Sequence, residues 1–156
     1  MTGAIASLHV RLLAAVACGV AVALLPGPPV AHGAARPLDI RATVRLVPGG
    51  GATLLQRGSF AGAPLGRGTL SLRTRIGEGD GATFSFVMAG AGGRLHGSGN
   101  VRLTFRGSTV IYRGHASIAA GSGAYRGMRA SGLRVSGRGP LTGETFDVRL
   151  TGRVST

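Results

Sequence analysis

The side chains able to carry chemistry are few in this chain, and they are spread along it. Beyond residue 34 the only histidines are His96 and His115. A zinc site takes about four ligands from histidine, cysteine and acidic side chains, and the sequence holds no cluster of that kind. We therefore expect no metal.

The acidic residues, which could act as general acids or bases, are Asp39, Glu78, Asp80, Glu144 and Asp147. Such chemistry needs a carboxyl group whose pKa is shifted in a pocket. Glu78 and Asp80 fall in a glycine-rich turn, whereas Asp39 and Asp147 alternate with apolar positions and stand beside arginines. The pattern predicts solvated ion pairs for Asp39 and Asp147, and it assigns no catalytic residue.

The segment Gly121–Gly127 reads G-S-G-A-Y-R-G. Its spacing, G-x-G-x-x-x-G, differs from the dinucleotide-binding fingerprint, and no helical pattern follows it. A P-loop needs a lysine and a nucleophile elbow needs G-x-S-x-G; the sequence contains neither. The segment therefore predicts a turn covered by a packed Tyr125, and we expect no cofactor.

The N-terminal segment has the pattern of a secretory signal peptide. Arg11 precedes an apolar run, Leu12–Leu25, which is followed by Pro26–Pro29 and then by small residues up to Ala35. This run of 14 residues is shorter than the roughly 20 that span a bilayer, which disfavours the alternative of a membrane anchor. We expect residues 1–34 to be a signal peptide, residues 35–156 to be one domain, and the protein to be secreted or held in the cell envelope.

Cys18, the only cysteine, lies inside that apolar run. Its lipidation is the alternative, but Ala15 stands where a lipidation motif has a larger aliphatic residue, and the run continues to Leu25. Without Cys18 the exported domain has no disulfide. That absence is more typical of a bacterial exported protein than of a small disulfide-rich scaffold.

The chain is strongly basic, with a formal net charge of +13, and all 18 basic residues are arginine. A coding bias toward G and C explains part of this arginine content. The remaining positive field favours anionic envelope polymers as partners. Specific nucleic-acid binding pairs such a surface with stacking aromatics, but Tyr112 and most phenylalanines fall on the apolar faces of the expected strands, so we expect no specific nucleic acid.

Apolar and polar residues alternate with period two in at least five segments, which is typical of strands with one apolar face. In residues 38–47 the apolar set is Leu38, Ile40, Ala42, Val44 and Leu46. The alternation recurs in residues 69–76, 83–88, 94–106, 110–118 and 145–154, and more weakly in residues 52–60 and 133–137. Turn residues at 48–51, 77–81, 90–93, 107–108 and 138–140 separate these segments.

Seven or eight short strands with hairpin-length connections predict an all-β fold, a small antiparallel eight-stranded up-and-down barrel. Glycines on the apolar faces, Gly97, Gly99, Gly114 and Gly152, allow strongly bent strands to close such a barrel. The candidate lining residues for an apolar ligand are Phe84, Phe86, Leu103, Phe105, Tyr112, Ile118, Phe146 and Val148. Because barrels of about eight strands are often filled by side chains, we expect a filled core rather than a cavity.

Four motifs in order add a family resemblance: G-x-x-x-I at Gly114–Ile118, G-S-G-x-Y-x-G at Gly121–Gly127, a strand at Leu133–Gly137, and F-x-x-x-L-x-G at Phe146–Gly152. Together they resemble the allene oxide cyclase and dirigent family. The resemblance implies an eight-stranded barrel with an apolar interior, often found as a homotrimer. Plant members cyclise an epoxy fatty acid or guide the coupling of phenolic radicals.

The family's catalytic residues cannot be carried over, because plant cyclases use amide groups and a glutamate inside the cavity. Here the only asparagine, Asn100, and the acid of the first strand, Asp39, both point outward in the expected alternation. The first hypothesis is a secreted, non-catalytic barrel that binds an apolar small molecule or serves as a structural module. The alternatives are an isomerase or cyclase acting on a fatty-acid-like or phenolic substrate, favoured by an inward carboxylate or amide in a real cavity, and a cell-envelope protein using its arginine-rich surface.

Overall fold

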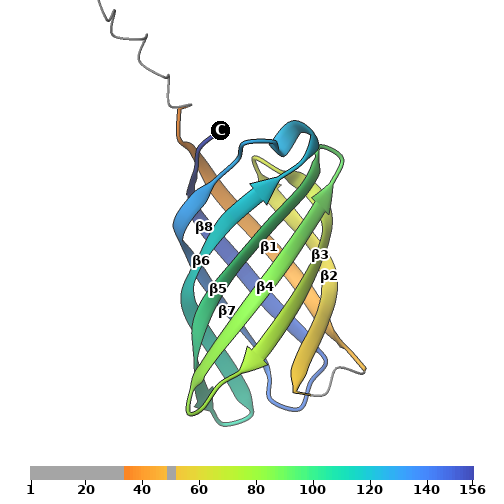
Figure 1. Cartoon of the computed structure of the whole chain (residues 1–156). Helices are drawn as coiled ribbons and strands as arrows, with labels where there is room; N and C mark the ends of the chain where they lie inside the picture. The colour runs from red at the N-terminus through yellow and green to blue at the C-terminus, as the bar shows by residue number, and fades with distance from the viewer. Residues whose placement is uncertain (1–33, 49–51) are drawn as a thin grey trace, which may run out of the picture. The chain divides into compact units, whose positions relative to one another are not determined.

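The computed structural model describes residues 34–48 and 52–156, and these residues form a closed antiparallel barrel of eight strands. Each strand pairs with the next along the chain, and the last strand pairs with the first (Figure 1). The expectation of an all-β, up-and-down, eight-stranded barrel is therefore confirmed. The expected signal peptide, apart from its last residue, lies outside the described residues.

The strands are long for so small a domain. They are β1 (Arg36–Val47), β2 (Thr53–Ala63), β3 (Gly66–Ile76), β4 (Gly81–Gly90), β5 (Gly93–Arg106), β6 (Thr109–Gly121), β7 (Ala130–Pro140) and β8 (Thr145–Val154). One short 3-10 helix, η1 (Gly123–Tyr125), lies between β6 and β7. Within the described ranges, no helix has the length and hydropathy to cross a bilayer.

One expected turn is wrong. Arg138, Gly139 and Pro140 are the last residues of β7, and the turn follows at residues 141–144. Pro140 pairs with Thr109, and Leu141 then donates its N–H to the Ser108 carbonyl oxygen over 2.7 Å. Proline is tolerated at the end of a strand, where its missing N–H breaks no interior ladder bond.

The barrel interior follows the period-two pattern of the sequence. Buried positions alternate with exposed ones along β1, β4 and β5, and no polar or charged residue is fully buried in the described part of the chain. The apolar faces of all eight strands therefore meet along one axis, which places the arginines outside.

Aromatic rings pack over inward glycines on the neighbouring strand. A Cβ built on Gly99 of β5 would lie 2.6 Å from Cζ of Phe84 on β4, so the ring occupies the space that a side chain would take. This arrangement lets large rings lie against the barrel wall. The ring–glycine pairs are Phe60 with Gly68, Phe84 with Gly99, Phe86 with Gly97, Tyr112 with Gly137, and Phe146 with Gly139.

The two ends of the barrel differ. The end that carries η1 and the C-terminus (Figure 1) is closed by Tyr125, which is 9% exposed and donates its hydroxyl hydrogen to the Leu65 carbonyl oxygen over 3.0 Å. Leu65 and Met128 are buried beside it. The Gly121–Gly127 segment is therefore a turn with a packed tyrosine, as its sequence predicts.

Candidate functional site

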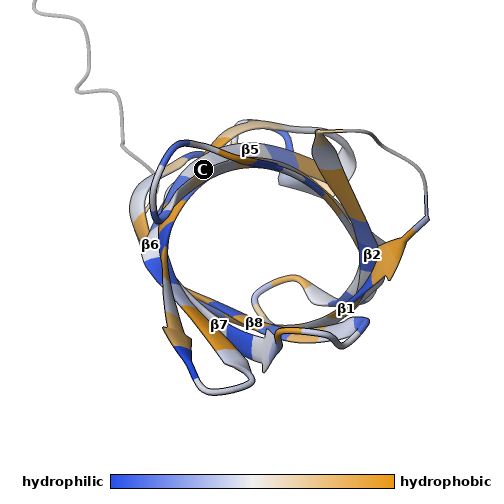
Figure 2. Cartoon of the chain, turned by 90° about the horizontal axis from the view of Figure 1, so that it is seen from below, coloured by the Kyte–Doolittle hydropathy of each residue, from blue (hydrophilic) through white to orange (hydrophobic). Residues whose placement is uncertain are grey.

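The end opposite Tyr125 is hollow. An apolar pocket of about 230 Å³ lies inside the barrel at the end formed by the β3–β4, β5–β6 and β7–β8 connections. Figure 2 looks at the barrel from this side and shows the strands closing into a ring. Most of the lining is aliphatic or aromatic, and its residues are Leu54, Gln56, Leu72, Thr74, Ile76, Ala82, Phe84, Val101, Leu103, Phe105, Val110, Tyr112, Val135, Leu141, Phe146 and Val148.

The structure divides the eight candidate lining residues between two regions. Six of them contact the pocket: Phe84, Leu103, Phe105, Tyr112, Phe146 and Val148. Phe86 and Ile118 instead lie in the packed half of the barrel, where they are 4% and 2% exposed. The expected filled core is thus present at the end closed by Tyr125, but the opposite half is not filled.

Packing over glycines explains part of this hollow. In the half of the barrel that holds the pocket, Phe84, Tyr112 and Phe146 lie over glycines of adjacent strands rather than across the barrel axis. The side chains between them are short, among them Ala82 and Val101. Rings held against the wall and small neighbours leave space along the axis.

The mouth of the pocket has an apolar rim. Four large apolar side chains are exposed among the described residues: Leu46 (38%), Ile76 (48%), Phe105 (56%) and Leu141 (54%). All four lie at this end, on β1, β3, β5 and the β7–β8 connection. Leu46, Ile76 and Phe105 continue the inward alternation of their strands, so in the described part of the chain apolar side chains extend from the interior to the mouth.

Two polar side chains stand together in the pocket wall. Thr74 on β3 donates its hydroxyl hydrogen to Oε1 of Gln56 on β2 over 3.2 Å. Because Oε1 accepts this bond, the amide nitrogen of Gln56 keeps its two N–H donors for a ligand. Sequence reasoning missed Gln56 as a site residue, although its signal was present: Gln56 shares the inward parity of Phe60 on the same strand.

Among the described residues, Tyr112 is the only titratable side chain that lines the pocket. Its hydroxyl donates to the backbone carbonyl of Asp147, and its ring lies over Gly137. Burial raises the pKa of Tyr112, and the nearby negative charge of Asp147 raises it further. Tyr112 is therefore a neutral phenol whose hydrogen is already engaged, a poor general acid or base.

The acidic residues lie outside the pocket. Arg149 donates two hydrogen bonds to Asp39, Nε to Oδ1 over 2.9 Å and Nη2 to Oδ2 over 2.7 Å, and these bonds lower the pKa of Asp39. The expected ion pair of Asp39 is thus present. Asp147 differs from expectation: it accepts a hydrogen bond from the Thr43 hydroxyl over 3.2 Å, and no ion pair forms there among the described residues.

The remaining polar candidates are exposed on the outer face. His96, His115 and Asn100 all point to solvent, as their alternation predicts. In residues 34–48 and 52–156, no three histidine, cysteine or acidic side chains lie close enough together to hold a metal ion. Among the described residues, the site is thus an apolar chamber with one amide–hydroxyl pair in its wall.

No protein-family model, no curated protein and no solved structure matches this chain.

Proposed function

We propose that this protein is a secreted, non-catalytic barrel that binds a small apolar molecule at its open end. The observation that carries the proposal is the apolar pocket of about 230 Å³ that opens through a rim of exposed apolar side chains. Exposed apolar surface that continues into a concave pocket is typical of a ligand site.

The pocket volume limits the ligand. Cavities of about 150 Å³ accept benzene, whereas drug-sized ligands occupy roughly 300–1,000 Å³. A pocket of about 230 Å³ therefore fits one ring with short substituents or a short acyl segment. A longer molecule would extend past the mouth and contact Phe105 and Leu141 on the rim.

The pocket polarity adds a second limit. Gln56 and Thr74 offer one localised polar site in a wall that is otherwise apolar, apart from the engaged Tyr112 hydroxyl. A carbonyl or hydroxyl oxygen on the ligand can accept from the Gln56 amide, so we propose an apolar ligand with a single hydrogen-bond acceptor. A fatty-acid-like or phenolic molecule meets this description, and the resemblance to the allene oxide cyclase and dirigent family supports the same class.

An isomerase or cyclase acting on such a molecule is the second candidate. It is favoured by Gln56, an inward amide in a real pocket. However, proton transfer needs a titratable group with a suitable pKa, and Tyr112 does not meet that need. Simple binding is therefore the better-supported function.

Fluorescence of N-phenyl-1-naphthylamine tests the proposal on the exported protein. The phenyl ring of this uncharged apolar probe matches the pocket volume, and its naphthyl group would lie against the apolar rim at Phe105 and Leu141. Leu103→Trp fills the pocket, whereas Thr104→Trp adds the same side chain to the outward position next to it. We expect the wild type and Thr104→Trp to enhance the probe fluorescence and Leu103→Trp to lose at least tenfold in affinity, about 1.4 kcal/mol. Equal probe binding by both variants, with both shown folded by circular dichroism, would refute the proposed site.

A further inference from the structure

The strand register aligns arginines from many strands in one row on the outside of the barrel. The row follows paired positions across the strands in the order β5, β6, β7, β8, β1, β2 and β3. Its residues in that order are Arg102, Arg113, Ser136, Arg149, Arg41, Ala61 and Arg67. We call the five arginines among them the arginine row. These residues lie far apart in the sequence, and only the register brings them together.

The arginine row places like charges directly opposite one another. Arg41 faces Arg149 across β1 and β8, and Arg102 faces Arg113 across β5 and β6. Cross-strand pairs lie about 4.5–5.5 Å apart at Cβ, where like charges destabilise a sheet. The row therefore carries a local electrostatic cost that the ion pairs of Arg149 and Arg102 offset in part and that a bound anion would offset further.

Acidic side chains neutralise only part of the row. Arg149 pairs with Asp39, and Arg102 pairs with Asp80 over 3.3 Å. In the described part of the chain, Arg41, Arg67 and Arg113 form no ion pair. Three guanidinium groups are thus available for a partner.

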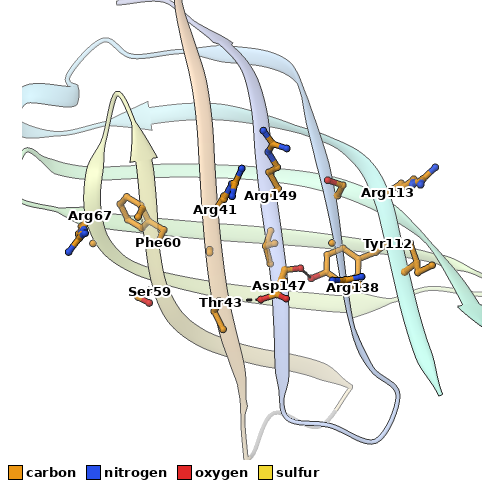
Figure 3. A pocket seen from close by; sticks show the side chains of 17 residues that line it. Arg41, Thr43, Ser59, Phe60, Arg67, Tyr112, Arg113, Arg138, Asp147 and Arg149 are labelled. Atoms are coloured by element: carbon orange, nitrogen blue, oxygen red, sulfur yellow. Dashed lines mark hydrogen bonds between the residues drawn. The ribbon is translucent and has the colours of Figure 1, made fainter.

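Most of the row lines an open groove of about 1120 Å³, to which Arg138 also contributes. Figure 3 shows Arg41 and Arg149 side by side at its centre, with Arg67 and Arg113 toward opposite sides. Hydroxyl groups of Ser59 and Ser136 line the same groove. Asp147 is the one carboxylate in the described lining, and it accepts a hydrogen bond from Thr43. The surrounding arginine and hydroxyl donors suit carboxylate, sulfate or phosphate groups, which arginine binds in a bidentate manner.

The spacing of the row suits an extended polymer. Neighbouring strands lie about 4.8 Å apart, so successive arginines stand roughly 5 or 10 Å apart around the barrel. A chain that bears a negative charge on every sugar or every second sugar presents charges at comparable intervals.

The curvature of the row distinguishes between anionic partners. It crosses seven of the eight strands, so it passes around most of the barrel. A flat bilayer can contact one side only, whereas a flexible chain can follow the curve. No aromatic side chain belongs to the row. Phe60 and Tyr112 line the groove, but Phe60 is only 3% exposed and the Tyr112 ring lies over Gly137, so the groove offers single-stranded nucleic acid little aromatic surface for stacking.

We propose that the arginine row binds a flexible anionic polysaccharide that winds across the strands, at a site separate from the apolar pocket. The site uses outward side chains only. Its occupation therefore leaves the mouth of the barrel open.

Alginate, a polyuronate, is the test probe, with binding to the exported protein measured over a series of salt concentrations. The row variant is Arg41→Gln/Arg113→Gln, and the control Arg94→Gln/Arg126→Gln removes the same charge from exposed arginines near the closed end. We expect the row variant to bind about tenfold more weakly at low salt, with a shallower salt dependence because it releases about two fewer counterions. The control should change less than twofold.

Equal weakening by the row variant and the control would overturn the proposal, because attraction would then follow net charge alone. Tighter binding to oligo-dT or to anionic lipid vesicles than to alginate, compared at equal charge concentration, would also overturn it. Both variants keep the pocket residues. Probe binding in the pocket therefore reports that they are folded, and it separates failure of this site from failure of the apolar site.

Discussion

At the scale of single residues, the chemistry of the pocket depends on the hydrogen bonds that its few polar groups make. Gln56 and Thr74 bond to each other and leave one amide nitrogen for a ligand. The Tyr112 hydroxyl donates a hydrogen bond to the Asp147 backbone carbonyl on β8. This bond links β6 to β8 across β7. The sequence shows the inward parity of these side chains, but it cannot show which hydrogen bonds engage them, because the partners lie on other strands.

Tyr112→Phe tests the role of the hydroxyl. The ring keeps its place over Gly137, but the Asp147 carbonyl loses its donor, so we expect a loss of about 1 kcal/mol in the free energy of unfolding at pH 7. Urea denaturation measures it. An unchanged urea midpoint would show that the hydrogen bond contributes no net stability.

The same variant should change how the free energy of unfolding depends on pH above pH 10. Burial raises the pKa of Tyr112 above its ordinary value of 10.0, so the folded state holds the phenolic proton more tightly than the unfolded state. That contribution is complete below about pH 10 and is lost as the pH rises further. Wild-type stability should fall more steeply above pH 10 than that of Tyr112→Phe, and parallel curves would contradict this assignment.

At the scale of elements, the barrel wall depends on rings packed over glycines. The alternation in the sequence predicts the inward faces, and the glycines among them predict bent strands. The pairing of each ring with a glycine could not be predicted, because it depends on the register between strands. The incorrect prediction of a turn at Arg138–Pro140 has a similar cause. The local composition indicates a turn, but pairing with β6 extends β7 through Pro140.

Gly139→Ala tests this packing. The nearest atoms to an added Cβ at Gly139 are all in the Phe146 ring, with Cε1 at 2.9 Å, so we expect a destabilisation of about 1–3 kcal/mol from overpacking. Phe146→Leu in the same chain should recover part of that loss. Gly81→Ala is the control, because nothing lies within 4 Å of its added Cβ; similar thermal shifts for Gly81→Ala and Gly139→Ala would contradict the account.

At the scale of the whole molecule, the described residues form a barrel closed at one end, open at the other, and ringed by arginines. The fold class could be predicted from the alternation together with the hairpin-length connections, and the six pocket aromatics and aliphatics from the alternation. The volume of the pocket could not, because it depends on whether rings lie along the wall or across the axis. The arginine row could not either, because one residue of slip between strands would break it.

Native mass spectrometry of the purified protein tests the central claim most directly, because it detects a bound small molecule and the oligomer together. We predict an added mass from one small apolar molecule per chain on the wild type and on Thr104→Trp, and none on Leu103→Trp; the resemblance to trimeric barrels further predicts a trimer in the same spectrum. An unliganded wild type that also fails to take up N-phenyl-1-naphthylamine, or an added mass that persists in folded Leu103→Trp, would contradict ligand binding in this pocket.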